Sequence, residues 1–288
     1  MKIAYLASQV TLPTAASRRS DAYEHDAMMD CLRAAFEPKG AQVDDIAWDD
    51  PDADWKAYDA AIIGTAWDYW DRHEEFLRTL QSIAEATLLL NSIATVRWNS
   101  HKSYLRDFGA KGISLIPTLW LDDANAEAAA AFDRLGADDV VFKRQVGAGA
   151  DGQHRLRRGQ PIPAMCEPMM AQPFLHAIQS EGEFSFIFID GGFSHALMKR
   201  AADGDYRIQS EYGGIEVAIT PSTEEIATAT RALLATPGET PLYARVDMLR
   251  GEAGDLLLME LELIEPYLYP QQGPELGDRL YAALKRRL

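Results

Sequence analysis

Apolar residues in the first part of the chain are spaced in two ways, and together these predict alternating strands and helices. Within residues 22–39 they recur every three or four positions, which is the period of an amphipathic helix, and Gly40 follows as a helix-ending residue. Shorter apolar runs without that period predict strands. We therefore expect strands over residues 2–7, 42–48, 60–64 and 88–90, and helices over residues 22–39 and 74–86.

This order of elements is typical of an open α/β sheet, in which ligands lie beyond the carboxyl ends of the strands. The rule makes residues 8–21 and 65–71 candidate site loops. Because the second loop contains Asp68 and Tyr69 between two tryptophans, these two residues are candidate substrate contacts. Packing of the aromatic side chains over the end of the sheet is an equally good account.

The rest of the chain predicts two further groups of elements. An apolar stretch at residues 169–175 contains Pro173, which makes it a poor central strand and a better linker. Later, Phe184, Phe186 and Phe188 alternate with more polar positions, and Asp-Gly-Gly at residues 190–192 predicts a hairpin turn. We expect strands over 112–120, 183–189, 193–200, 243–249 and 256–264, and helices over 100–108, 125–135, 221–234 and 276–284.

The composition is that of a folded protein with a strong negative charge. The 288 residues, 47% of them hydrophobic, are enough for one large domain or two smaller ones. A formal charge of −16 argues against nucleic-acid or anionic-membrane partners, although a local cluster of cations still allows ATP. The two cysteines form no disulfide framework, and there is neither a signal peptide nor an apolar membrane span. We expect a cytoplasmic enzyme.

A glycine loop follows the apolar run that carries Lys143. Gly147, Gly149 and Gly152 match the G-x-G-x-x-G pattern of dinucleotide sites, but that pattern requires a helix after the loop, and residues 153–163 contain three helix-breaking glycines and prolines. The loop instead reads as a flap between two strands, whose backbone N–H groups could approach phosphates. A plain hairpin loop explains the glycines alone, but a lysine within an apolar strand needs an anionic partner.

Three acids fall on neighbouring predicted strands. Glu260 and Glu262 share one face of their strand, and Asp247 lies on the strand before it. A solvent-facing surface could carry them, but like charges opposed across strands destabilise a sheet. Mg²⁺ reverses that sign because it prefers oxygen ligands, and no histidine accompanies the acids to suggest zinc. We favour a magnesium site.

Other candidate residues are individually less informative. Lys102 would lie in the first turn of the helix over residues 100–108, where a solvated lysine is the simpler reading. The linker residues Gln172, Pro173, Phe174 and Leu175 offer a place for an adenine ring between two lobes. Tyr267 and Tyr269 follow the acidic strand and are candidates for lining a substrate pocket, or equally for packing against the last helix.

Taken in order, these residues resemble the ATP-grasp superfamily, and the resemblance covers nearly the whole chain. It implies an ATP-grasp fold with an N-terminal Rossmann-like α/β lobe (residues 1–98), a small central lobe with the glycine flap (99–175) and a C-terminal antiparallel-sheet lobe with the metal site (176–288). It also implies an ADP-forming ligase that joins a carboxylate to an amine through an acyl phosphate, with ATP and Mg²⁺, or alternatively Mn²⁺, as cofactors.

The resemblance also implies a role for each residue. Lys102 and Lys143 would hold the ATP phosphates under the flap of Gly147, Gly149 and Gly152, with adenine at Gln172 to Leu175 and a ribose hydroxyl on Glu183. Asp247, Glu260 and Glu262 would bind magnesium, and Arg200 and Arg207 would act with Lys143 on the transferred phosphate or the substrate carboxylate. Two positions depart from the family pattern, since Gln172 often is Glu there and Glu262 often is Asn.

Within the superfamily, the chain is similar to the branch of prokaryotic glutathione synthetase and the ribosomal-protein glutamate ligase. Residues 65–69, 97–105 and 264–269 look more like D-cycloserine synthetase, which closes a ring on an O-ureido-D-serine precursor. The likeness implies a small amino-acid-like substrate, with intramolecular ring closure as one form of the reaction, and a homodimer is common in this branch. The alternatives are a non-catalytic nucleotide-binding protein of the same fold and a dinucleotide-dependent oxidoreductase.

Overall fold

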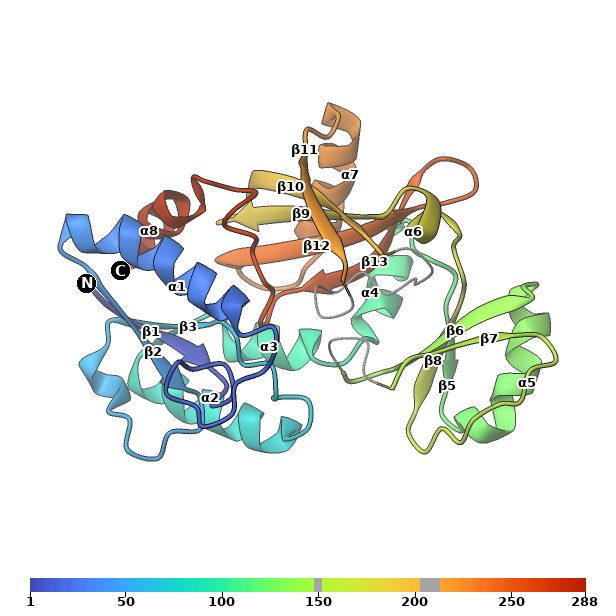
Figure 1. Cartoon of the computed structure of the whole chain (residues 1–288), viewed down its shortest axis with the longest axis horizontal. Helices are drawn as coiled ribbons and strands as arrows, with labels where there is room; N and C mark the ends of the chain where they lie inside the picture. Colours follow the sequence, from blue (N-terminus) through green and yellow to red (C-terminus); the bar gives the residue numbers. More distant parts are fainter. Residues whose placement is uncertain (148–151, 203–212) are drawn as a thin grey trace.

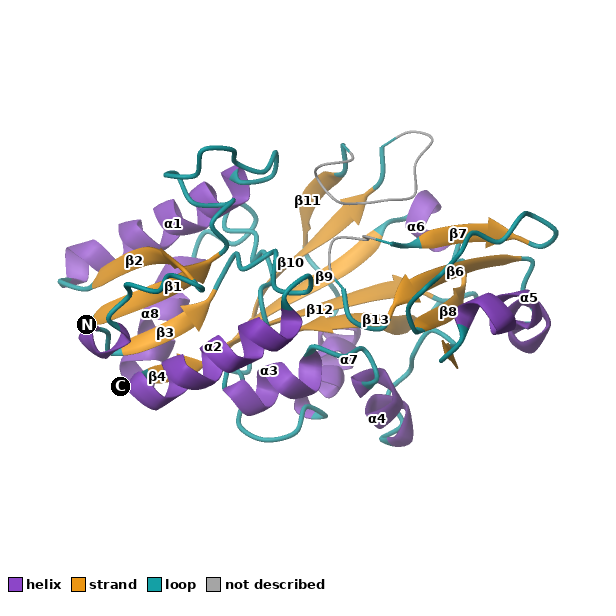
Figure 2. Cartoon of the chain, turned by 90° about the horizontal axis from the view of Figure 1, so that it is seen from below, coloured by secondary structure: helices purple, strands orange, loops and turns teal. Residues whose placement is uncertain are grey.

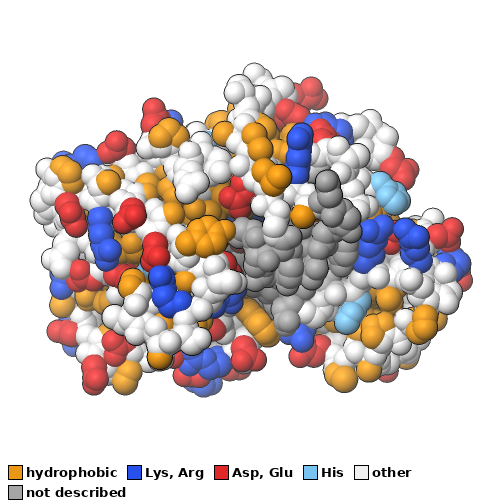
Figure 3. Space-filling view, in the orientation of Figure 1, with side chains coloured by type: hydrophobic (Ala, Val, Ile, Leu, Met, Phe, Trp, Pro, Cys, Tyr) orange, Lys and Arg blue, Asp and Glu red, His pale blue; other side chains and the backbone are white. Residues whose placement is uncertain are grey.

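Three sheets form the framework of the molecule. The computed structural model describes residues 1–147, 152–202 and 213–288, and Gly149 and Arg207 lie outside them. From left to right in Figure 1, the first sheet lies at one end, a five-stranded sheet in the middle and a second four-stranded sheet at the other end. In Figure 3, acidic and basic side chains are interspersed over the surface, so the charge of −16 is not gathered into one acidic area on that face.

The first sheet is parallel, with strand order β2-β1-β3-β4, as the N-terminal spacing predicted. Its helices α1 and α2 lie on opposite faces (Figure 2), where Phe36 of α1 and Phe76 of α2 are fully buried in separate cores. The elements are β1 (Lys2–Ala7), α1 (Tyr23–Phe36), β2 (Gln42–Ala47), β3 (Ala60–Ile63), α2 (His73–Ala86) and β4 (Leu88–Leu90).

Two short helices connect this sheet to the next group of elements. The single helix expected over residues 100–108 is wrong, because Ser100 caps the end of α3 and Lys102 lies in the turn before α4. The strand expected over 112–120 is reduced to β5, since Leu115 instead bridges to Leu258 of the middle sheet. The elements are α3 (Ile93–Asn99), α4 (Tyr104–Ala110), β5 (Leu119–Leu121) and α5 (Ala124–Leu135).

The second four-stranded sheet is antiparallel, with strand order β5-β8-β6-β7. It places β8 between two neighbours, so the prediction that residues 169–175 make a poor central strand was wrong. The proline is tolerated because Pro173 is the last residue of β8 and lies beyond its pairing with β5, where only β6 adjoins it. The remaining strands of this sheet are β6 (Asp139–Arg144), β7 (His154–Arg157) and β8 (Met169–Pro173).

The middle sheet is antiparallel, with strand order β11-β10-β9-β12-β13. Alternation puts Phe184, Phe186 and Phe188 of β9 on one face, where they pack with α7 and α4 in an apolar core. The other face carries Glu183 and Ser185 near the start of β9, and Ile187 and Ile189 toward its end, where they join the core of the first sheet. The elements are α6 (Ala177–Ser180), β9 (Glu183–Ile189), β10 (Gly192–Arg200), β11 (Ile215–Ile219), α7 (Thr223–Leu234), β12 (Tyr243–Arg250) and β13 (Leu256–Glu262).

The C-terminal helix α8 (Leu276–Arg287) packs against α1, although the predicted lobes assign it to the third lobe. Leu280 and Leu284 join Met28 and Leu32 in one core, and the small residue Gly277 allows close approach, since a Cβ there would lie 2.7 Å from the backbone oxygen of Cys31. The lobe boundaries after residues 98 and 175 stay a prediction. Within the described ranges, no helix is long and apolar enough to cross a membrane.

Candidate active site

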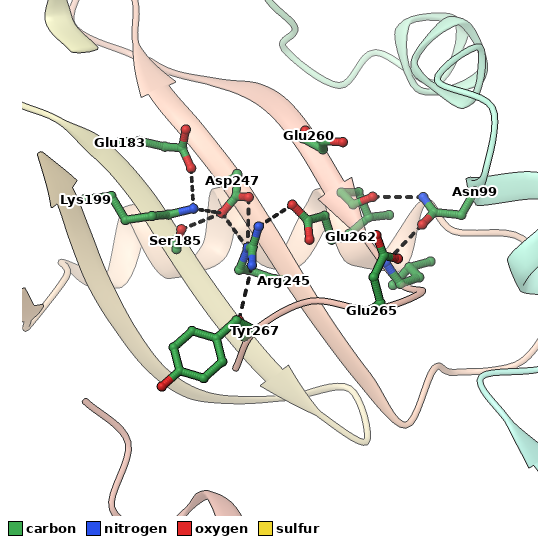
Figure 4. A network of polar contacts seen from close by, with 12 residues as sticks. Asn99, Glu183, Ser185, Lys199, Arg245, Asp247, Glu260, Glu262, Glu265 and Tyr267 are labelled. Carbon is green, nitrogen blue, oxygen red and sulfur yellow. Dashed lines mark hydrogen bonds and ion pairs between the residues drawn. The ribbon is translucent and has the colours of Figure 1, made fainter. Parts of the chain in front are cut away.

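A row of charged side chains crosses four neighbouring strands on the polar face of the middle sheet. Strand register places Lys199 beside Glu183, Asp247 beside Glu260, and Arg245 beside Glu262. Figure 4 shows Lys199, Glu183, Asp247, Arg245 and Glu262 pointing toward one another from β10, β9, β12 and β13, with Glu260 to one side of them. We call this set, Glu183, Ser185, Lys199, Arg245, Asp247, Glu260 and Glu262, the polar row.

Arg245 holds the centre of the polar row. Its Nε lies 3.0 Å from Asp247 Oδ2, another guanidinium nitrogen donates to Glu262, and its Nη1 donates to the backbone oxygen of Tyr267 at 3.2 Å. Burial alone would raise the pKa of Asp247, but Arg245 and Lys199 outweigh it and lower that pKa. No role was predicted for Arg245 from the sequence. The sequence did contain a signal for Arg245, because it is a charged residue inside an apolar strand, which is the feature that marked Lys143.

A second buried cation pairs with two acids. Lys199 Nζ lies 2.6 Å from Glu183 Oε1 and 3.4 Å from Asp247 Oδ1. Burial, reinforced by the nearby charge of Asp247, raises the pKa of Glu183 to about 7, although Lys199 opposes the shift. The contact to Lys199 lacks hydrogen-bond geometry, so neither oxygen of Glu183 has a hydrogen-bond partner among the described residues. The carboxylate is therefore available to accept a hydrogen bond from a ligand.

Glutamine at position 183 is expected to flatten the pH dependence of stability between pH 4.5 and about 7. In this window the folded protein holds a proton on Glu183 that the unfolded chain has released, since the ordinary pKa is 4.5. The free energy of unfolding therefore falls as pH rises, and Glu183→Gln removes that contribution. Chemical unfolding at pH 5, 6, 7 and 8 measures the effect. The exposed control Glu252→Gln should run parallel to wild type, and a parallel curve for Glu183→Gln would contradict the assignment.

Lys102 reaches the polar row from the turn between α3 and α4. Its ammonium is paired with Glu260, and its backbone N–H donates to the carbonyl of Gln145 at 2.7 Å, just beyond the end of β6. Burial opposes the charged form, but Glu260, Glu262 and Glu265 outweigh it and raise the pKa of Lys102. The solvated lysine of the simpler sequence reading is thus a partly buried ion pair.

Lys143 differs from the other cations because no acceptor among the described residues is paired with its ammonium. Burial lowers its pKa, Glu260 opposes that shift and Lys102 adds to it. A half-buried lysine in such surroundings is stabilised by an anion that comes from outside the chain.

The glycine loop joins the antiparallel strands β6 and β7, so the dinucleotide fingerprint is excluded and the predicted two-strand loop is confirmed. Gly152 has φ +65°, and a Cβ there would lie 2.4 Å from Arg144 Nε. Gly147 lies at the other described end of the loop, and Gly149 is outside the described residues.

The predicted adenine segment ends the central strand β8. Gln172 is buried and donates to Thr118 Oγ1 at 2.9 Å, while Phe174 is covered by the guanidinium of Arg155, 3.3 Å from the ring centroid. Pro173 and Leu175 are half-buried. The Gln172 side chain therefore makes its hydrogen bond within the protein. An adenine base would contact the backbone groups of the residues that follow it.

Two of the residues predicted to contact substrate, the tyrosines after β13, lie beside the polar row. Tyr267 and Tyr269 pack at 4.6 Å between ring centroids, and the charged ends of Lys199 and Arg245 each lie 5.7 Å from the Tyr269 ring. Both tyrosines are buried. They form an aromatic wall beside the two cations.

Asp68 and Tyr69 are engaged within the first sheet's own core. Asp68 accepts hydrogen bonds from Trp48 at 2.8 Å and from Arg72 at 2.7 Å, and Tyr69 packs on Phe76 at 5.0 Å. The equal alternative, aromatic packing at the end of the sheet, describes them well. The pKa of Tyr69 is nevertheless raised, first by burial and then by the negative charge of Glu265, which follows β13.

Alternation along β10 puts Arg200 on the side of the sheet opposite Lys199. Its Nε donates to the backbone oxygen of Glu181 at 3.0 Å, so Lys199, and not Arg200, supplies the cation on the polar row. A role was predicted for Arg200 and none for Lys199, and the role of Arg200 toward phosphate or substrate stays a prediction. Arg207 lies outside the described residues.

The acids fit magnesium in chemistry and position, because Asp247, Glu260 and Glu262 offer oxygen donors on adjacent strands. As they stand, cations hold all three, and no group of three metal-binding side chains converges within the described part of the chain. Metal binding at these acids therefore requires Lys102 and Arg245 to give up part of their contacts.

Comparisons with known proteins point in one direction. The family model for the N-terminal domain of D-cycloserine synthetase DcsG matches residues 3–91. The cycloserine biosynthesis protein DcsG of Streptomyces lavendulae is 29% identical over 262 residues, which cover 84% of this chain and 87% of that protein. The crystal structure of D-cycloserine synthetase DcsG superposes with a TM-score of 0.85 at 26% identity, over 100% of this chain and 99% of the other.

More distant structures share the fold. D-alanine–D-alanine ligase from Bacillus anthracis matches with a TM-score of 0.70 at 16% identity, covering 99% of this chain and 96% of that one. The ATP-grasp ligase PsnB matches with a TM-score of 0.64 at 17% identity, covering 98% of both chains. The similarity therefore extends through all three sheets.

Proposed function

We propose that this chain, which is homologous to D-cycloserine synthetase and has the ATP-grasp fold, is an ADP-forming ligase that joins a carboxylate to an amine on small amino-acid-like substrates. The observation that carries the proposal is the polar row, which gathers buried cations and acids on the middle sheet, together with Lys143, whose ammonium has no partner among the described residues. Ring closure within one substrate molecule is the favoured form of the reaction, because the most similar proteins described here act in cycloserine biosynthesis.

In this proposal ATP lies between the second and middle sheets. The backbone of residues 172–175 receives the adenine, the carboxylate of Glu183 accepts a ribose hydroxyl beside its contact to Lys199, and Lys102 and Lys143 hold the phosphates beneath the glycine loop of Gly147, Gly149 and Gly152. Asp247, Glu260 and Glu262 would hold Mg²⁺, which when bound neutralises charge on the phosphates and aligns them.

The chemistry asks this chain mainly to position groups and to compensate charge. The substrate carboxylate attacks the terminal phosphate of ATP, which gives an acyl phosphate and ADP, and the amine then displaces phosphate to form the amide. Lys143 and Arg245 face the charge that develops during transfer, and Arg200 and Arg207 stay proposed contacts of the phosphate or the substrate. The aromatic wall of Tyr267 and Tyr269 would line the substrate side and keep water from the acyl phosphate.

Finer parts of the proposal rest on the family resemblance alone. Mn²⁺ would serve as an alternative to Mg²⁺, because carboxylate oxygens are suitable ligands for both ions. The protein would act as a homodimer in the cytoplasm on small molecules. Asp68 and Tyr69 would act on the substrate from the first sheet.

ADP release with Mg²⁺ against a panel of amino acids and serine derivatives, including O-ureido-D-serine, tests the function. We expect ADP, and no AMP, with one carboxylate–amine combination. AMP release would mean that the carboxylate is adenylated and would overturn the mechanism. ATP binding without turnover on any member of the panel would favour a non-catalytic nucleotide-binding protein of the same fold.

A further inference from the structure

Glu265 is fixed at the junction of the middle sheet and the first sheet. Its backbone oxygen accepts a hydrogen bond from Trp67 Nε1 at 3.1 Å. Two residues earlier, the N–H of Leu263 donates to Asn99 Oδ1 at 2.9 Å, and Asn99 Nδ2 donates to the oxygen of Leu261 at 2.8 Å. The loop after β13 is therefore held on both sides, from α3 and from the loop after β3.

The carboxylate of Glu265 has no partner on another described residue. Its own backbone N–H is the donor that faces it, although the residue is 92% buried, with 8% of its surface exposed. The neighbouring acids differ: Glu260 is paired with Lys102, and Glu262 with Arg245. In Figure 4 the Glu265 side chain lies between Glu262 and Asn99, apart from the contacts around Arg245.

The charged surroundings leave this acid uncompensated. Glu262 and Glu260 add negative charge, Lys102 is already engaged by Glu260, and the Tyr243 hydroxyl donates to the backbone oxygens of Ile63 and Ile264 instead. Burial first, and then Glu262, raise the pKa of Glu265 well above its usual range. A cationic ligand would stabilise the ionised form of this buried acid and so offset the free energy that its desolvation costs.

An ammonium group fits better than a metal ion. A divalent cation needs several oxygen donors, and no set of three metal-binding side chains meets within the described residues. An ammonium needs one strong acceptor with its remaining donors free for other groups. The Glu265 side chain lies beside Glu262 at the end of the polar row (Figure 4), so a substrate held at the row has this carboxylate as a neighbouring acid that is not paired with a cation among the described residues.

We propose that Glu265 binds the ammonium group of the amino-acid substrate whose carboxylate is phosphorylated. This inference rests on the proposed function. Glu216 is the rival acid, because it is half-buried and lies beside Lys199 in the strand register. It is the weaker candidate, since two cations compensate part of its charge: burial raises the pKa of Glu216, and Lys199 and Arg245 oppose that shift.

The test compares the amino acid that drives ADP release with its 2-hydroxy analogue, in wild type, Glu265→Gln and Glu216→Gln. Wild type should prefer the amino acid, and Glu265→Gln should lose about 100-fold in kcat/KM for it, mainly through KM, while its activity on the hydroxy acid stays the same. Glu216→Gln should keep the wild-type preference. Binding of ADP, followed by tryptophan fluorescence, should be equal in all three proteins and reports that the nucleotide site is intact.

Each other result overturns the inference. An equal loss on both substrates would mean that Glu265 is structural, and a loss of preference only in Glu216→Gln would assign the ammonium to that acid. If wild type releases ADP with an amino acid but Glu265→Gln behaves identically, the inference fails while the ligase function stands. If no amino acid drives ADP release in wild type, the proposed function fails first.

Discussion

Methionine at position 143 is expected to lower ADP release by about 10³-fold while leaving the fold intact. The ammonium of Lys143 is buried near Glu260 and has no partner among the described residues, so its charge is available to the transferred phosphate. The substitution keeps the length of the side chain and removes a charge that burial disfavours, so the melting temperature should stay level or rise. Steady-state ADP release and thermal unfolding, measured on the same preparation, check both parts.

The matched control for this variant is Lys56→Met, which removes an exposed lysine from a turn of the first sheet. It should retain wild-type turnover. If Lys143→Met kept most of its activity, Lys143 would have no part in phosphate transfer. If it unfolded, the ammonium would have a structural partner instead.

Asparagine at position 247 is expected to abolish turnover and to lower the free energy of unfolding by about 3 kcal/mol. Asp247 is the shared partner of two buried cations, Lys199 and Arg245, and it also accepts a hydrogen bond from Ser185. Asp247→Asn leaves buried positive charge without its counterion and removes one of the proposed metal acids. Urea unfolding followed by circular dichroism gives the stability, and ADP release gives the activity.

Asp190→Asn provides the contrast, because Asp190 pairs with Arg286 and Arg287 at the surface, where ion pairs contribute about 1 kcal/mol or less. Equal stability losses in the two variants would show that the polar row is solvated and that burial does not control its energetics. An inactive Asp247→Asn protein of wild-type stability would assign Asp247 to ligand binding alone.

Local patterns in the sequence were enough to predict much of the fold. The helical spacing of Met28, Leu32 and Phe36 marked α1, and the turn at residues 190–192 marked the β9–β10 hairpin, because both signals lie within a few neighbouring residues. Alternation along β12 and β13 also grouped Asp247, Glu260 and Glu262 on one face, which their pairing confirms.

Long-range contacts were beyond that reasoning. The pairing of Lys102 with Glu260 joins residues 158 positions apart, and nothing local to Lys102 distinguishes it from a solvated lysine. Which of Lys199 and Arg200 lies on the polar row depends on the exact strand phase, because a shift of one residue changes the face. The central place of β8 could not be predicted either, because it depends on which strands pair with it. Pro173 lies beyond the last residue of β8 that pairs with β5.

The packing of α8 on α1 bears on how the protein is made. The apolar side of α1, at Met28 and Leu32, is completed by Leu280 and Leu284, which the ribosome adds only after all the intervening strands. The N-terminal lobe therefore emerges first but waits, with part of its core uncovered, until α8 has been synthesised. A nascent chain arrested before α8 should expose that surface to chaperones, and residues 1–98 expressed alone should aggregate.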